Sequence, residues 1–221
     1  MTLEGTNSYL VGRDPCWLID PGPDDDGHVE ALGAEAERRG GLAAVVLTHG
    51  HRDHAAAAER FDAPVLRPAD GEAVGPLMAL ATPGHAPDHV CLVSGPVCFC
   101  GDLLLGHGSS FVPPREHGGS LAEYLASLER LAACDLDVLH PGHGPPIEDP
   151  AAKIAAYLEH RRMRERLLLA ALESGERSRA RLLDIAWEDV PAELRGAAAV
   201  VMEAHLEKLG DEGRLPVDLA D

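Results

Sequence analysis

Residues 48–54 read THGHRDH and place three imidazoles and one carboxylate within six positions, at His49, His51, Asp53 and His54. The apolar run AAVVL precedes this segment and a run of alanines follows it. A solvated surface does not need so many coordinating groups, and a protein core does not accept them without partners. Neutral imidazole and carboxylate are ligands that suit zinc, and also iron or manganese. The segment therefore predicts a metal site.

Three further ligand-type residues each follow a strand-like apolar run. His85 stands in TPGHAPDH, Asp102 in CFCGD and His143 in HPGHGPP. Each is a weak signal alone, but all three occupy the loop after a predicted strand, and such loops gather at one edge of the sheet in a layered α/β fold. With the first four residues they make seven ligands, enough for two metal ions that share one carboxylate.

Strand-like runs and helical patterns alternate over the first 150 residues. The runs are SYLV, CWLID, AAVVLTH, PVLRP, LMALAT, HVCLVS, VCFCGD and DVLH, and turn-forming pairs such as PG and DG separate them. Helices are expected near 27–39 and 53–61 and over 120–133, where Ser120 and Glu123 have the spacing of a capping box. Interleaved strands and helices predict an α/β layer architecture with the helices outside the sheet.

The pattern changes after Pro150. Helical periodicity is expected near 151–173, 178–187 and 191–209, and the chain then reads LGDEGRLPV. A helical tail of this length predicts a small accessory module, with a junction at the EDPAA stretch. We therefore expect a catalytic domain over residues 1–150 and a helical domain over residues 151–221.

The formal net charge of −18 lies mostly in residues 1–150, which hold 8 Lys and Arg against 23 Asp and Glu. Nucleic-acid-binding proteins usually carry a basic surface, so this excess disfavours RNA as a partner, although bound divalent cations would offset it locally. The five cysteines form no CxxC pair and are expected to be reduced and packed in a cytoplasmic protein. No signal peptide is evident and no run is long enough to cross a membrane, so no membrane partner is expected.

The order of these motifs resembles the metallo-β-lactamase superfamily. HxHxDH, the His of TPGH, the Asp of GD and the His of PGHG follow one another, and Asp20 in WLIDPGP matches the first motif of that family, usually a support for the metal-binding loop. The resemblance covers the chain from its first residues to about residue 150. It implies a four-layer αβ/βα sandwich with the metal ions at its edge.

One branch of the superfamily, the beta-lactamase-like endoribonucleases, is more similar still. GTNSYLVG, GHGSSFV before a helix that contains YLASL, and EHRRMRE resemble this branch, as does a winged-helix-like C-terminal tail, so the resemblance extends over nearly the whole chain. Relatives usually have a strand before MTLEGTN, where this chain begins. We therefore expect an edge strand to be absent or the start to be misplaced.

The resemblance also implies how the ligands divide between two zinc ions, for which iron or manganese are alternatives. The division is His49, His51 and His85 on the first ion, Asp53, His54 and His143 on the second, and Asp102 as a bridge between both.

Two cations close together lower the pKa of a shared water until hydroxide forms near neutrality, and this hydroxide attacks a carbonyl carbon or a phosphorus. Asp53 is the predicted catalytic residue, because it would orient the hydroxide and accept its proton. The general acid is not identified. His89 and His107 are candidates, and for each the competing interpretation is a polar residue that supports the site.

Four other residues have two interpretations each. His160, Arg161 and Arg164 in EHRRMRE share one helix and would present an anion-binding face toward the cleft, or would pair with neighbouring acidic side chains on a solvated helix. Asn7 in the GTN turn would reach the metal site or satisfy its own backbone.

The resemblance implies a binuclear metal hydrolase of a small ester or thioester, in the manner of glyoxalase-II-like and carrier-thioesterase relatives, and the acidic surface fits this function. Alternatives are a single-strand endoribonuclease, an iron-dependent persulfide dioxygenase and a metal-binding scaffold without catalysis. A β-lactamase is disfavoured, because a bridging Asp without a cysteine ligand looks more like the hydrolases of thioesters and phosphodiesters. Packing or homodimerisation is expected of the helical tail, which lacks a basic recognition helix.

Overall fold

Two β-sheets form the centre of the fold in the computed structural model, which describes residues 5–215 and residue 219. The first sheet has the order β1–β2–β3–β4, in which β1 is antiparallel to β2 and the other pairs are parallel. Its strands are β1 (Tyr9–Gly12), β2 (Cys16–Ile19), β3 (Leu42–Val46) and β4 (Val65–Leu66).

The second sheet has the order β5–β6–β7–β8–β9. Its neighbouring strands are antiparallel except for β8 and β9, which are parallel because helix α3 (Leu121–Ala132) connects them. The strands are β5 (Ala73–Val74), β6 (Leu77–Ala81), β7 (Val90–Ser94), β8 (Val97–Gly101) and β9 (Val138–Pro141).

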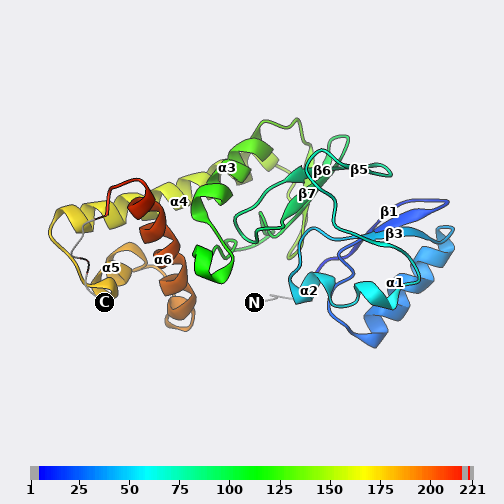
Figure 1. Ribbon diagram of the computed structural model, residues 1–221, viewed down its shortest axis with the longest axis horizontal. Coiled ribbons are helices and arrows are strands. Elements are labelled where there is room, and N and C mark those ends of the chain that lie inside the picture. The colour runs from blue at the N-terminus through cyan, green and yellow to red at the C-terminus, as the bar shows by residue number, and fades with distance from the viewer. Residues whose placement is uncertain (1–4, 216–218, 220–221) are drawn as a thin grey trace.

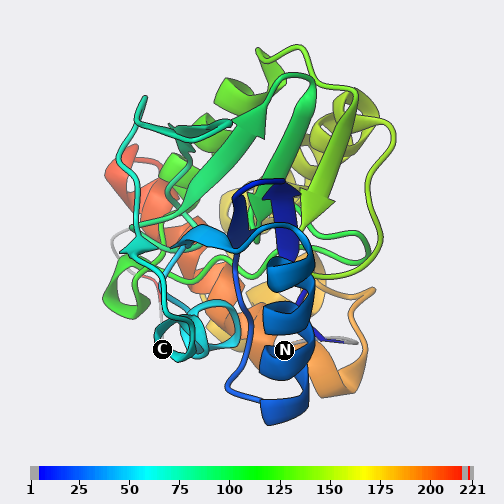
Figure 2. The ribbon, with the colours of Figure 1, turned by 90° about the vertical axis from the view of Figure 1, so that its right-hand side faces the viewer.

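Alternation along the strands buries both faces of the first sheet. Ile19 and Val46 point toward the second sheet and belong to the core between the sheets, together with Leu92. Their neighbours Leu18 and Val45 belong to a second core on the outer face. Helix α1 (residues 26–38) covers this outer face (Figure 2). The period of two residues therefore gives the strands two buried faces, as expected of an inner layer.

The outer face of the second sheet is covered by α3 and by the first half of α4 (Pro150–Glu173). Tyr124 and Leu128 of α3 and Tyr157 of α4 share a core with Cys98 of β8. The layers are thus helix, sheet, sheet and helix, and Figure 1 shows the long α4 running from the second sheet toward the C-terminal helices. The predicted αβ/βα four-layer fold is confirmed.

The C-terminal region is helical and has its own hydrophobic core. The second half of α4 packs with α5 (Arg179–Ala186) and α6 (Arg195–Asp211), and a 3-10 helix, η3 (Ala192–Leu194), precedes α6. Helix α6 also packs against α3. The end of the expected winged-helix-like tail, at residues 216–218, lies outside the described residues.

The prediction of one continuous helix near 53–61 is wrong. The structure has a short α2 (Arg52–Ala55) followed by the 3-10 helix η1 (Ala58–Arg60). The interruption has a cause in the backbone, because the carbonyl oxygen of His54 accepts from the N–H of Gly22 (3.0 Å) and the N–H of Ala57 donates to the oxygen of Gly22 (3.1 Å). These bonds replace the next helical ones.

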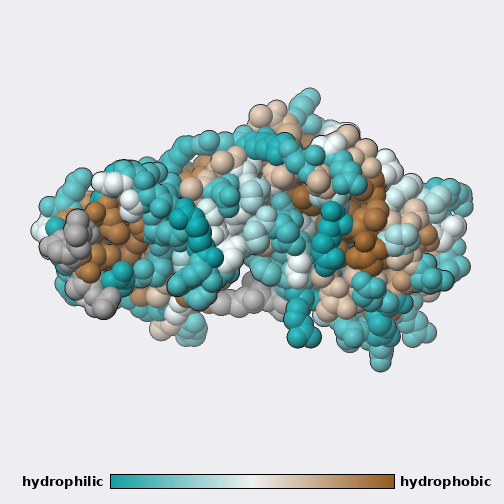
Figure 3. Space-filling model, viewed as in Figure 1, coloured by the Kyte–Doolittle hydropathy of each residue, from teal (hydrophilic) through white to brown (hydrophobic). Residues whose placement is uncertain are grey.

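Other expectations from sequence hold. Ser120 caps α3 by accepting from the N–H of Glu123 (3.3 Å). All five cysteines are free thiols, and four of them are buried. No helix within the described ranges is both long and apolar enough for a membrane span. In the view of Figure 3, hydrophobic residues gather between the two sheets and among the C-terminal helices, and hydrophilic residues cover most of the remaining face.

Arg164 of α4 closes the C-terminal core. Its side chain is 5% exposed, and its guanidinium donates to both carboxylate oxygens of Asp189 (2.6 and 2.9 Å) and to the carbonyl oxygen of Ala186 (2.5 Å). It also lies 5.4 Å from the ring centre of the buried Trp187. Arg164 therefore fastens α4 to the turn that follows α5.

We expect Asp189→Asn to lower the free energy of unfolding by about 1 kcal/mol at pH 7, since the carboxylate is exposed and only its partner is buried. The hydrogen bonds from Arg164 lower the pKa of Asp189 below its ordinary value of 3.8. The contribution is therefore present above pH 3.8 and is lost as the pH falls through the lower value of the folded state. Urea unfolding followed by Trp187 fluorescence at several pH values measures it.

The matched control for this pair is Glu188→Gln, which removes the neighbouring exposed carboxylate. It should leave the unfolding midpoint unchanged. Equal losses in the two variants would contradict a specific contribution of the Arg164 pair.

Candidate metal centre

The seven residues predicted as ligands lie together at one end of the sandwich, where strands of both sheets terminate. The contributing segments are the loop and short helix after β3, the β6–β7 loop and the residues that follow β8 and β9. They carry His49, His51, Asp53, His54, His85, Asp102 and His143.

The first group consists of three imidazoles. His51 Nδ1 lies 3.1 Å from His49 Nε2 and 2.9 Å from His85 Nε2. All three nitrogens lie within 4.8 Å of one another. Such convergence of nitrogen atoms has the form of three ligands to one cation.

The second group joins two imidazoles to carboxylates. His143 Nε2 lies 3.4 Å from Asp53 Oδ2, and His54 Nε2 lies 3.9 Å from the same oxygen. Asp102 stands between the two groups, with Oδ1 3.4 Å from His54 Nε2 and Oδ2 3.7 Å from His85 Nε2 and 3.5 Å from His143 Nε2. Its carboxylate faces both groups, as the bridging role requires.

Two buried atoms at the centre of this arrangement, His54 Nε2 and Asp102 Oδ1, have no hydrogen-bond partner in the described part of the chain. An unpaired buried polar atom destabilises a fold by about 1–3 kcal/mol, so such atoms indicate a missing partner. A cation between them would satisfy both. The donor set therefore fits a bound metal.

The outward ring nitrogens are occupied. His85 Nδ1 lies 2.7 Å from the carbonyl oxygen of Phe111, and His143 Nδ1 lies 2.8 Å from that of Gly5. A carbonyl can only accept, so each Nδ1 carries the proton and each Nε2 presents its lone pair inward. This tautomer is the one that binds a metal through Nε2.

Asp20 fixes two of the other three imidazoles, His54 directly and His49 through Thr48. It accepts from the N–H of Thr48 (2.8 Å), from Thr48 Oγ1 (2.6 Å) and from His54 Nδ1 (2.9 Å). Thr48 Oγ1, which donates to Asp20, in turn accepts from His49 Nδ1 (3.0 Å). His49, His54 and Asp20 also come close enough to form a third potential metal group. The oxygens of Asp20 are already occupied, so it supports the metal-binding loop.

The electrostatics of the site favour a positive charge between the carboxylates. Burial lowers the pKa of His49 and of His85, so both rings are neutral near pH 7. Burial also disfavours charge on His54 and His143, but nearby carboxylates, above all Asp102, outweigh it and raise each pKa to about 10. A divalent cation would supply the same positive charge in place of these protons.

Of the two candidates for the general acid, His89 is excluded. It is fully buried, and burial lowers its pKa to about 3. Its Nε2 accepts from the N–H of Asp102 (3.1 Å) and its Nδ1 pairs with Thr82 Oγ1 (2.9 Å). His89 thus orients Asp102 from behind. His107 is exposed and lines a cavity with residues 5–9.

Asn7 follows neither of its two interpretations. Its Nδ2 donates to the carbonyl oxygens of Pro141 (3.0 Å) and Gly144 (2.8 Å), which flank His143. Asn7 therefore fastens the N-terminal loop to the loop that carries His143, and its hydrogen bonds within the described residues go to backbone oxygens of that loop.

The expected anion-binding face of α4 is wrong. Arg164 turns inward to Asp189, and His160 Nε2 accepts from Arg164 Nε (3.3 Å). Arg161 is 3% exposed and donates to Ser109 Oγ (3.1 Å) and to the carbonyl oxygen of Ser110. The alternative expectation, an ion pair with an acidic side chain, is correct for Arg164, although its partner Asp189 is distant in sequence.

Sequence reasoning missed a set of three α4 side chains, here called the α4 ladder, that holds the loop 105–110. Lys153 Nζ donates to the oxygen of Gly106 (3.0 Å). The Tyr157 hydroxyl accepts from the N–H of Leu105 (3.1 Å) and donates to the oxygen of Gly108 (3.0 Å). Arg161, with its two serine contacts, completes the set. The spacing of four residues is a signal in the sequence, but nothing there shows which loop the side chains bind.

The loop held by the α4 ladder continues into the metal centre. Ser110 Oγ donates to the carbonyl oxygen of Asp102 (2.5 Å), and the next residue, Phe111, supplies the acceptor for His85. The C-terminal region is thus connected to two ligand residues through one loop.

Comparison with known proteins identifies the family. The model of the metallo-beta-lactamase superfamily matches residues 1–64 and 66–143. A lactamase-like protein, adaB, from Aspergillus niger is 37% identical over 206 residues, which cover 82% of this chain and 62% of that protein. An atrochrysone carboxyl ACP thioesterase from Aspergillus fumigatus is 30% identical over 247 residues, covering 100% of this chain and 72% of that protein. The chain belongs to the metallo-beta-lactamase superfamily, whose members are metal-dependent hydrolases.

Solved structures agree on the fold. A metallo-beta-lactamase family protein from Thermus thermophilus superposes with a TM-score of 0.74 at 25% identity, covering 94% of this chain and 89% of that one. A protein solved in a di-iron-bound form superposes with a TM-score of 0.58 at 29% identity, covering 69% and 93%. The first match includes the C-terminal helices. The chain spans 62% of the length of the adaB relative, so an activity of that whole protein does not transfer directly.

The α4 ladder predicts that a helix outside the matched residues 1–143 controls metal affinity. We expect Tyr157→Phe to weaken metal binding by about tenfold, because the loop that orients Asp102 and His85 loses both hydroxyl bonds. Competition with a chromophoric chelator measures the affinity. Asp189→Asn is the control, since it loosens the C-terminal core without touching the loop. Unchanged affinity in Tyr157→Phe, or an equal loss in the control, would contradict the prediction.

Proposed function

We propose that the chain is a hydrolase of small esters or thioesters that uses two zinc ions, with thioesters as the preferred substrates. The observation that carries this proposal is the pair of ligand groups that share the Asp102 carboxylate. The first ion would be held by the three-imidazole group and the second by Asp53, His54 and His143. When bound, the two cations would lower the pKa of a shared water and stabilise negative charge on the attacked oxygen.

Asp53 is the proposed proton acceptor. Its hydrogen bond with His143 lowers its pKa, so it is a carboxylate near neutrality. Its side chain is 29% exposed, in contrast to the buried His54 and His143, and is therefore accessible to a substrate and to the attacking water. A carboxylate in this position can orient the water and take its proton.

The lack of a buried general acid among the described residues favours a thioester as the substrate, because its thiolate is a good leaving group. A thiol has a pKa near 8.5, so a thiolate leaves without the strong acid that an alkoxide needs. His89 is fully engaged and neutral, and His107, the other candidate acid, is an exposed side chain in a polar cavity of about 680 Å³. The aligned thioesterase from Aspergillus fumigatus, which matches the whole chain, supports the same substrate class.

The endoribonuclease remains the second candidate, on the sequence resemblance alone. Against it stand the net charge of −18 and the inward orientation of Arg161 and Arg164, which removes the basic face expected for RNA. The di-iron-bound relative supports iron as an alternative metal. A persulfide dioxygenase is disfavoured, because all ligands of a two-ion site are retained.

We further propose that residues 1–150 and 151–221 are separate domains, the second winged-helix-like. The core shared by α5, α6 and the end of α4 supports this division, while the first half of α4 packs against the first domain. Homodimerisation through the second domain stays a prediction.

The activity assay separates the two candidates. Freshly purified protein, with its metal content determined by mass spectrometry, is offered acyl thioesters, the matching oxygen esters and short single-stranded RNA, each with and without a chelator. We expect chelator-sensitive thioester hydrolysis and intact RNA, because the acidic chain repels a polyanion. RNA cleavage without thioester turnover would replace the proposed function by the second candidate.

The ligand assignment has its own test. We expect Asp102→Ala and His143→Ala each to remove about one metal ion per chain and to lower hydrolysis by at least about 100-fold, since each removes a proposed ligand of the second ion. Mass spectrometry of the metal and initial rates are the readouts. His117→Ala, at an exposed histidine on the 3-10 helix 115–117, is the control and should change neither. Full metal retention in both ligand variants would refute the assignment.

A further inference from the structure

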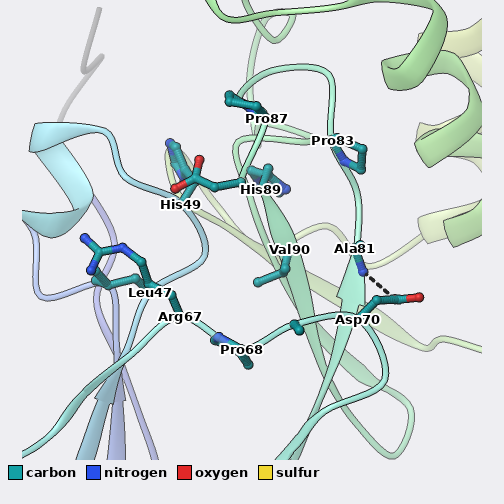
Figure 4. A pocket seen from close by; sticks show the side chains of 12 residues that line it. Leu47, His49, Arg67, Pro68, Asp70, Ala81, Pro83, Pro87, His89 and Val90 are labelled. Atoms are coloured by element: carbon teal, nitrogen blue, oxygen red, sulfur yellow. Dashed lines mark hydrogen bonds between the residues drawn. The ribbon is translucent and has the colours of Figure 1, made fainter.

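A cavity of about 280 Å³ lies beside the first ligand group and is not used by the proposed chemistry. Three segments line it: Leu47 and His49 just after β3, residues 67–70 after β4, and residues 81–90 from the end of β6 to the start of β7. Figure 4 shows the rings of His49 and His89 above Val90, with Arg67 and Pro68 on the opposite side. The cavity therefore extends away from the metal centre between the two sheets.

The walls of the cavity are mainly apolar. Leu47 and Val90 contribute buried aliphatic side chains, and Pro68, Pro83 and Pro87 contribute rigid rings. Apolar walls with a few polar groups are typical of small-molecule sites. Such walls suit the aliphatic stem of a substrate.

One wall of the cavity is shared with the candidate metal centre. His49 lines the cavity and also belongs to the three-imidazole group through its Nε2. A substrate whose reacting carbonyl lies at this group could therefore extend a short chain past the His49 ring into the cavity.

The charged side chains that line the cavity are those of Arg67, Asp70 and Asp88. Among them, Arg67 is the cation, and it has no partner within the described residues. Asp70 is engaged by Arg130 (2.9 Å) and by the N–H of Ala81 (2.8 Å). No hydrogen bond or ion pair engages the exposed Arg67 guanidinium among residues 5–215 and 219. Asp88 forms no ion pair with it, and its Oδ2 faces Gly50, 3.0 Å from the position that a Cβ would take there.

A free guanidinium is unusual on this protein. With 37 acidic residues against 19 basic ones, most arginines find a carboxylate, and the overall field repels anions. An unpaired guanidinium beside an apolar cavity offers two parallel donors to a carboxylate or phosphate group.

We propose that this cavity is a substrate subsite that accepts a short aliphatic chain carrying an anionic group, with Arg67 as the residue that recognises the anion. The inference rests on the proposed function, because it treats the cavity as an extension of that active site. The anionic group belongs either to the acyl part of the thioester, as a terminal carboxylate, or to the thiol part, as a phosphate.

Kinetics with three thioesters distinguish these sources. Butyryl-N-acetylcysteamine carries no anion, succinyl-N-acetylcysteamine adds a terminal carboxylate, and butyryl-coenzyme A adds phosphates on the thiol side. We expect Arg67→Met to lower kcat/KM about fivefold, mainly through KM, for one charged substrate and to leave the neutral one unchanged. Loss with succinyl identifies the carboxylate, and loss with coenzyme A identifies the phosphate.

The matched control is Arg13→Met, which removes an exposed arginine from the β1–β2 turn, away from the cavity. It should leave all three substrates unchanged. Equal effects of the two variants on the charged substrates, or no effect of Arg67→Met, would overturn the subsite.

If the wild type hydrolyses no thioester, the proposed function is refuted, but the subsite is not. A binding measurement then tests the subsite by itself. Succinate, inorganic phosphate and, as the uncharged control, butyramide are titrated into the wild type and the Arg67→Met variant, and backbone amide shifts are followed by NMR. We expect succinate or phosphate to shift amides in 67–70 and 81–90 of the wild type, with an effect weaker by about fivefold or more in the variant. Absence of such shifts would overturn the subsite independently of activity.

Discussion

The buried carboxylate of Asp20 organises the metal-binding edge. Asp20 stands at the end of β2 with a positive φ of 46°, a backbone conformation that L-residues adopt only where their surroundings compensate for it. The compensation is visible in its three hydrogen bonds, one of which reaches His54 directly while the others reach Thr48 and, through it, His49. One carboxylate thereby joins β2, β3 and α2 and sets the tautomers of two imidazoles.

The other loops that carry candidate metal ligands are also held by hydrogen bonds on the side facing away from the metal centre. The groups that hold them are distant in sequence. His89 holds the backbone of Asp102, and Asn7 holds the loop around His143. Close approach is part of this arrangement, since a Cβ on Gly142 would lie 2.5 Å from His54 Cε1 and 2.6 Å from Asp102 Oδ1. Only glycine fits there. The ligand atoms thus converge because every loop is constrained on its outer side.

The parts that follow from local sequence were predictable. The ligand-type residues follow apolar runs of strand length, so their placement at one edge of the sheets, including that of His85 and Asp102, could be read from spacing. The inward orientation of Arg161 could not be predicted from the sequence, because charged residues on a helix usually face water. Its acceptors also lie about fifty residues earlier in the chain. The end of α2 is caused by hydrogen bonds with Gly22, and the cavity lined by Arg67 is formed by three separate segments. Both features depend on residues distant in sequence, so no local sequence pattern predicts them.

Helix α4 belongs to two cores at once. Residues near its start, such as Ile154, pack under the second sheet, and residues near its end, such as Leu172, pack with α5 and α6. The helix has 24 residues, hence a length of about 36 Å, and an unbroken helix transmits rotation along its axis as a stiff rod. A partner that tilted α4 as a whole would therefore act, through Lys153 and Tyr157, on the loop that carries Ser110 and reaches Asp102. By linkage, metal occupancy would then bias the tilt of α4 to the same extent.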